Sequence, residues 1–112
     1  MARTKNRKAR KAIADNSKET VDNLDARLAV ARKFNASARL LLELAGNENA
    51  DVRLFVAKNR DTPYYVLALL ATDENKIIRR EVAWNRNTPY YVLAKLAMDE
   101  DKHVRWAVSA RI

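Results

Sequence analysis

The chain repeats itself with a period of 26 residues. Residues 61–86 and 87–112 align without a gap and are identical at 14 of 26 positions, and residues 35–60 share 10 positions with the copy that follows them. A partial copy at 9–34 precedes these three and is clearest in DARLAVARKF. A fixed period in this range is typical of stacked repeats, in which each unit contacts mainly its neighbours. Such proteins form extended surfaces rather than enclosed pockets, which favours a binding function.

The first half of each copy predicts a helix. A Thr-Pro pair at 62–63, and again at 88–89, is expected to open it. Threonine is a preferred N-cap because its hydroxyl accepts from first-turn amides, and proline suits the first helical position. In the copy at 35–60, Asn35 or Ser37 would have to provide the cap. Leucine and alanine then recur with i, i+3, i+4 spacing, which predicts a buried stripe of Leu41, Leu44, Ala45, Leu67, Leu70, Ala71, Leu93, Leu96 and Ala97.

The second half of each copy predicts another short helix. Polar turns at 47–49, 73–75 and 99–101 are expected to cap its start. Asn59 and Asn85 are expected to close it. Because the chain has only one glycine and two prolines, an all-β sandwich is disfavoured. We therefore predict an all-α fold. The short apolar stripe of this second helix consists of the i, i+4 pairs Val52/Val56, Ile78/Val82 and Val104/Val108.

The combined pattern T-P-x-x-x-L-x-x-L-A-x-D…V-R-x-x-V-A-x-N resembles the leucine-rich repeat variant family, a relative in style of the HEAT-like α-helical repeats. The resemblance extends over about residues 25–112 and is strongest across NRDTPYYVLALLATDENKIIRREVAWNRNTP. It implies a short right-handed α-solenoid of about three and a half helix-pair repeats, usually a binding scaffold. The type member carries an iron–sulfur cluster on cysteines, and this chain has no cysteine. We expect a single repeat domain over 12–112, a basic flexible tail over 1–11, and no cofactor or metal.

The net charge of +8 is segregated by the repeat. The second helices total +10, the first helices with their turns total −6, and residues 1–11 add +6. Part of this segregation is generic, because acids before a helix and bases at its end suit the helix dipole. Four arginines recur at one repeat position. In HEAT-like stacks such an arginine commonly pairs with an acid of the neighbouring repeat, so we expect a structural arginine ladder of Arg27, Arg53, Arg79 and Arg105.

The remaining cations of the second helices are expected to follow phosphates, with the basic tail as a flexible arm. Trp84 stands at the repeat position of Lys58, so we expect it to be exposed and to stack on a base or on a partner side chain. The candidate binding residues are Arg3, Lys5, Arg7, Lys8, Arg32, Lys33, Lys58, Arg60, Lys76, Arg80, Trp84, Arg86, Lys102 and Arg111.

Two further aromatic features need an explanation. For the tyrosine pairs at 64–65 and 90–91, packing between repeats is favoured, with one ring of each pair toward the stack. Trp106 and Ile112 leave the C-terminal end apolar. That end is expected to dock onto a partner, in the simplest form as a homodimer. In the alternative, Trp106 folds over the last helix pair and caps it.

The sequence disfavours an enzyme. There is a single histidine, His103, at a variable turn position, and no Gly-rich phosphate loop. Trp84 with Glu81 is the only hint of a HEAT-like DNA glycosylase, and those enzymes are much longer.

Nucleic-acid binding is the first hypothesis. The alternative is a protein-binding adaptor or inhibitor that engages an acidic protein surface. No apolar run of roughly 20 residues is present, so we expect no membrane association and a cytoplasmic location.

Overall fold

The computed structural model describes residues 23–33 and 36–111. That part of the chain contains only helices and no strand, so the predicted all-α class is confirmed. The predicted flexible tail at 1–11 and Ile112 lie outside the described residues. The seven helices are α2 (Leu24–Arg32), α3 (Ala38–Ala45), α4 (Ala50–Lys58), α5 (Tyr64–Leu70), α6 (Lys76–Trp84), α7 (Tyr90–Leu96) and α8 (Lys102–Arg111).

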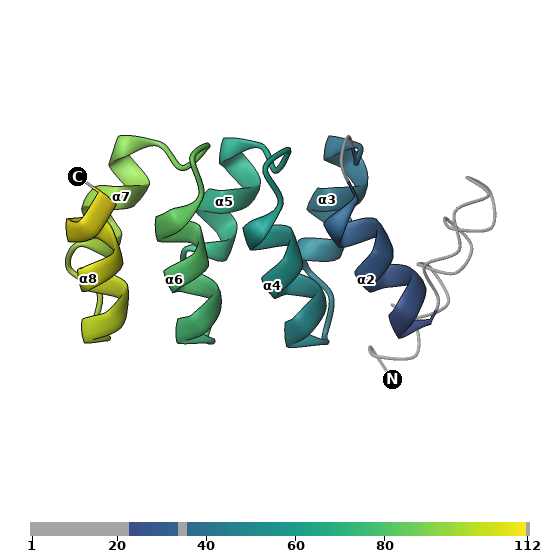
Figure 1. Ribbon diagram of the computed structural model, residues 1–112, viewed down its shortest axis with the longest axis horizontal. Helices are drawn as coiled ribbons and strands as arrows, with labels where there is room; N and C mark the ends of the chain where they lie inside the picture. The colour runs from purple at the N-terminus through teal and green to yellow at the C-terminus, as the bar shows by residue number, and fades with distance from the viewer. Residues whose placement is uncertain (1–22, 34–35, 112) are drawn as a thin grey trace.

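The helices alternate between two rows (Figure 1). In the even row, α2 contacts α4, α4 contacts α6, and α6 contacts α8. In the odd row, α3 contacts α5, and α7 follows at the same end as α8. Each odd-row helix also packs on the even-row helix that follows it in sequence. The even row therefore presents one continuous surface built from successive segments of the chain.

The core lies between the two rows. The leucine stripe of the odd row is buried at all six leucines, and so are the valine and isoleucine pairs of the even row. Fully burying one such side chain stabilises a fold by roughly 1.5–3 kcal/mol. The alanine positions of the stripe deviate, because Ala45 and Ala71 are half-buried and Ala97 is exposed. The apolar stripes are thus confirmed at their large residues.

The starts of most helices are capped as the sequence predicts. Ser37, rather than Asn35, caps α3 by accepting from the Leu40 amide at 3.1 Å. Asn49 and Asn75 accept from amides two residues further on, at the starts of α4 and α6. At the start of α8, Asp101 accepts from the amides of His103 and Val104. These caps occupy the three polar turns named above.

The prediction that threonine caps the helices at 62–63 and 88–89 is wrong. Pro63 and Pro89 are the N-cap residues of α5 and α7, and neither helix has a side-chain cap. Thr62 is buried beneath the end of α4, where its hydroxyl donates to the carbonyl of Val56 at 2.6 Å. Thr88 is buried beneath α6 in the same way. A buried hydroxyl without a partner costs about 1–3 kcal/mol, and the carbonyl at the helix end provides that partner.

Candidate functional site

Two buried asparagines join the ends of neighbouring even-row helices. Asn59 is the C-cap of α4, and its Nδ2 donates to the carbonyls of Ala31 and Lys33 at 2.7 and 3.1 Å. Asn85, the C-cap of α6, donates to the carbonyls of Ala57 and Asn59 at 2.8 and 3.0 Å. The predicted helix ends are confirmed, and the links between helices were not foreseen.

Arg111 repeats this link with a different side chain. It lies 26 positions after Asn85, and its Nη1 donates to the carbonyls of Ala83, at 2.9 Å, and of Asn85. Its Nη2 donates to the carbonyl of Arg86 at 3.2 Å. Arg111 was predicted to bind a partner, whereas its half-buried guanidinium is occupied by the end of α6. The 26-residue spacing from Asn85 was the signal that pointed to this role.

Cations and aromatic rings gather where α2, α4 and α6 end. Two neighbouring hollows lie there, of about 220 and 420 Å³, and both are lined by Lys58 and Arg60. Arg32 and Phe55 complete the first hollow, and Trp84 and Arg86 complete the second, together with the helix-end asparagines. We call this surface the basic groove, and its residues are Arg32, Phe55, Lys58, Arg60, Trp84 and Arg86.

Phe55 was missed by the sequence analysis. The Arg32 guanidinium lies 5.0 Å from its ring centroid, and the Lys58 ammonium lies 5.5 Å from it. At such distances the ring quadrupole attracts a cation. Glu81 and Ala107 stand at the same position in the later copies, so the repeat offered no pattern there. The three-residue spacing of Phe55 and Lys58 on one helix was the only available signal.

Three of the four cations of the basic groove have no carboxylate near them among the described residues. Within the described part of the chain, no carboxylate lies within ion-pair distance of Arg32, Lys58 or Arg86. The C-terminal end of a helix carries negative partial charge, which would oppose an anion. Here the terminal carbonyls of α2, α4 and α6 accept from the asparagines, threonines and Arg111 described above. The cations are therefore the dominant charge at this surface.

Trp84 and Trp106 form one aromatic pair. Their ring centroids lie 5.9 Å apart with the planes at 70°, an edge-to-face arrangement. Trp84 is 41% exposed, as expected, and Trp106 is 63% exposed. The sequence assigned the two rings to different surfaces, the binding face and the C-terminal end. The structure joins them in one pair across α6 and α8.

The other candidate cations lie elsewhere. Lys33 is exposed at the end of α2, beside the groove, and is not among the lining residues. Lys76 and Lys102 begin α6 and α8, at the N-terminal ends of these helices, whereas the basic groove lies at the C-terminal ends. Lys76 faces Asp101 at 3.9 Å, and Arg80 faces Glu81 at 3.8 Å. Outside the described residues lie Arg3, Lys5, Arg7 and Lys8.

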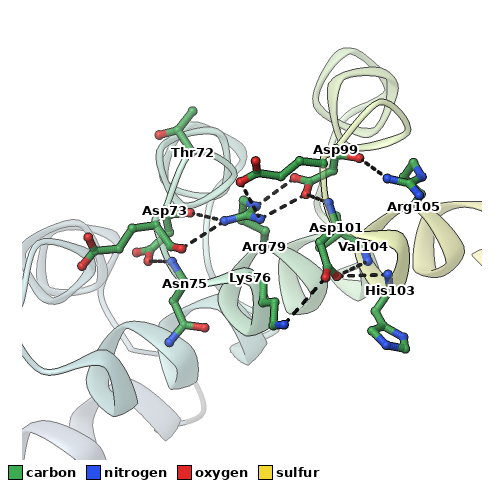
Figure 2. A network of polar contacts seen from close by, with 12 residues as sticks. Thr72, Asp73, Asn75, Lys76, Arg79, Asp99, Asp101, His103, Val104 and Arg105 are labelled. Carbon is green, nitrogen blue, oxygen red and sulfur yellow. Dashed lines mark hydrogen bonds and ion pairs between the residues drawn. The ribbon is translucent and has the colours of Figure 1, made fainter.

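The arginine ladder is confirmed at its two central members. Arg53 donates through Nε to Asp73, and Arg79 donates through Nε to Asp99, both at 2.8 Å. Nη1 of each arginine donates to two carbonyls of the turn before its own helix. Figure 2 shows Arg79 between the two turns that contain Asp73 and Asp99. Arg105 is exposed, and its Nη1 donates to the carbonyl of Asp99 at 2.6 Å.

The pair of Arg79 and Asp99 shifts the pKa of both groups. The hydrogen bond with Asp99 raises the pKa of Arg79 against the effect of burial, and the nearby acids add to the rise. For Asp99, burial raises the pKa, but hydrogen bonds from Arg79 and from the Asp101 amide, with the charges of Arg79 and Arg105, lower it overall. Both shifts favour the charged forms, as expected for a structural ion pair.

The prediction for the tyrosines is wrong. All four rings are exposed, from 42% at Tyr65 to 84% at Tyr90, so neither pair directs a ring into the core. Val66 and Val92 occupy the buried position of that first helical turn, together with the leucine stripe. The tyrosines are therefore exposed rings in the first turns of α5 and α7, in the odd row.

The described residues contain no group of three or more side chains suited to hold a metal ion. His103 is exposed at the start of α8. Glu81, the carboxylate weighed for a glycosylase, is half-buried beside Arg80. Among the described helices, none is long and apolar enough to cross a membrane.

Comparison of the chain with protein-family models, with curated proteins and with solved structures finds no significant match. The function is therefore argued from the site alone.

Proposed function

We propose that this protein is a non-enzymatic binding module that engages nucleic acid through the basic groove. In this proposal the two rows of helices form a short right-handed α-solenoid of the leucine-rich repeat variant or HEAT-like type. The 26-residue period and the alternation of the helices between two rows support it. A solenoid of this kind acts through its extended surface, and the basic groove gathers four cations on that surface.

The observation that carries the proposal is the gathering of four cations around two hollows, three of them without a carboxylate partner among the described residues. Arg32, Lys58 and Arg86 come from the ends of successive even-row helices and have no carboxylate partner in the described region. Neighbouring helix axes lie about 8–10 Å apart, so these cations follow an extended line rather than a point. An extended polyanion fits such a line better than a small anion does. The basic residues Arg3, Lys5, Arg7 and Lys8 add a further arm in this proposal.

The test is the salt dependence of binding to a fluorescently labelled oligonucleotide, followed by anisotropy. Each phosphate contact releases counterions, so the four cations of the basic groove alone predict a slope of about −3 in log K against log salt. The double variant Lys58→Glu/Arg86→Glu removes two contacts and is expected to reduce the slope by about 2.

The matched control is Lys95→Glu, which reverses an exposed cation on α7 in the odd row. It changes the net charge in the same direction but leaves the basic groove intact, so binding is expected to fall far less. Equal losses, compared per charge, from Lys95→Glu and from the groove variant would refute the assignment of the site. Absence of binding at low salt would refute the function.

A second candidate function rests on the exposed pair of Trp84 and Trp106. Paired aromatic rings of this exposure are common at the centres of protein interfaces. An adaptor or inhibitor that binds an acidic protein surface would use these rings as anchors beside the groove cations. Its affinity would fall only gently with salt, because the rings rather than the charges would supply most of the binding energy.

A further inference from the structure

The aromatic rings stand within the row of cations rather than beside it. Arg32, Lys58 and Trp84 occupy the same repeat position on α2, α4 and α6. Phe55 lies beneath the first two, in contact with both charges. A ligand that follows the groove therefore meets cations first and then the ring of Trp84. A surface that recognised phosphates alone would have no use for a tryptophan at that point.

We propose that the ligand of the basic groove is a single-stranded nucleic acid, with a base stacked on Trp84. This inference rests on the proposed function and narrows it. A duplex presents phosphates and groove edges to a protein surface, while its base faces are stacked inside the helix. A single strand exposes its base faces, and stacking on an aromatic ring is tolerant of base identity. The combination of a basic groove with aromatic rings is the usual composition of a single-strand binding site.

The edge-to-face contact with Trp106 positions Trp84 for this role. The contact, with ring centroids 5.9 Å apart, holds the Trp84 indole against Trp106, while Trp84 stays 41% exposed. A ring that is held in one orientation loses less side-chain entropy when a base stacks on it. Trp106 thus acts as a positioning residue for Trp84, and it also offers a second exposed ring at the end of the same row.

The neighbouring hollow provides the next contact along the strand. Arg32 and Lys58 lie over the ring of Phe55, and the planar guanidinium of Arg32 can itself stack on a base. Lys58 and Arg60 line both hollows, so they lie between the stacking positions. That order places phosphate-binding charges between two positions for bases, as a continuous strand requires.

The test compares a labelled oligothymidylate of roughly 12 nucleotides with a duplex of the same length, at one low salt concentration. The expected result is tighter binding of the single strand, with quenching of the tryptophan fluorescence of the wild-type protein. Trp84→Leu is expected to weaken single-strand binding on the order of ten-fold and to leave duplex binding unchanged. The matched control is Tyr90→Leu, which removes a more exposed ring from the odd row.

The outcomes distinguish the single-strand inference from the proposed nucleic-acid function. Equal binding of duplex and single strand, with no effect of Trp84→Leu and no quenching, would overturn the single-strand inference and leave the proposed nucleic-acid function standing. Binding of neither probe would overturn the proposed function as well. If the melting temperature of Trp84→Leu equals that of wild type, the variant is folded and its loss of binding is a local effect. The quenching measurement tests the stacking without any variant.

Discussion

The link between α4 and α6 through Asn85 gives the sharpest stability prediction. In Asn85→Ala, the carbonyl of Ala57 loses its side-chain donor and the carbonyl of Asn59 keeps only the Thr62 amide. The amide of Asn87 loses its acceptor at 2.9 Å. A buried hydrogen bond contributes about 1 kcal/mol net, and an orphaned buried group costs more. Three such bonds are lost, so we expect the free energy of unfolding to fall by about 3 kcal/mol. That is a large part of the 5–15 kcal/mol typical of a domain.

Urea unfolding at neutral pH, followed by circular dichroism, measures this effect. With an m-value of about 1–3 kcal/mol/M, a loss of 3 kcal/mol lowers the midpoint by roughly 1–3 M. Asn85→Asp keeps the size and the acceptor for Asn87 but turns an anion toward two carbonyls, so it is expected to be at least as destabilising. The control is Asn87→Ala, which removes two side-chain hydrogen bonds to the carbonyls of Arg60 and Thr62. Because Asn87 is exposed, water can take up part of that role and a smaller loss is expected. An Asn85→Ala protein within about 0.5 kcal/mol of wild type, comparable to an ordinary surface substitution, would refute the reasoning.

Three further expectations concern charged and polar positions of the ladder and the groove. Arg79→Glu is expected to lower the free energy of unfolding by about 3 kcal/mol, because it breaks a buried ion pair. Arg86→Glu is expected to leave the free energy of unfolding unchanged and to weaken oligonucleotide binding. Equal stability losses from the two variants would contradict these assignments. Because the folded-state pKa of Asp99 is lowered, its stabilisation is present above its unfolded pKa of about 3.9 and is lost as the pH falls through the folded value. The stability difference between wild type and Asp99→Asn should therefore be largest near neutral pH and shrink in acid, and a difference that is constant with pH would argue against the ion pair. Asn47 stands at the repeat position of Asp99 and is buried with an unpartnered Nδ2. Asn47→Asp offers a carboxylate to Arg27 and is therefore expected to raise the free energy of unfolding by about 1 kcal/mol. A lower melting temperature would contradict this.

The sequence predicted those features that repeat at the same position in successive copies. Arg53 and Arg79 recur with their acids one repeat further on, so the ladder could be inferred without coordinates. The same logic would have linked Arg111 to Asn85, but the change of residue type concealed the shared role. A position in the period thus reveals a contact more reliably than the identity of the side chain does.

Contacts that do not follow the period could not be inferred. Trp84 and Trp106 are 22 residues apart, and their contact depends on the lateral spacing of α6 and α8. The cluster of Phe55 with Arg32 depends on the same spacing between α4 and α2. The direction of the Thr62 hydroxyl was missed because a hydroxyl both donates and accepts. Only the position of the Val56 carbonyl decides between the two roles.

The links between helix ends also bear on how the chain reaches its fold. Asn59, Asn85 and Arg111 each reach back to a carbonyl 28 residues earlier. The entropy of closing a loop grows with the logarithm of its length, so each link costs nearly the same, about 3 kcal/mol from the length term. Low contact order of this kind is associated with fast folding. During synthesis, the end of each even-row helix receives its side-chain donor as soon as the next helix pair has emerged.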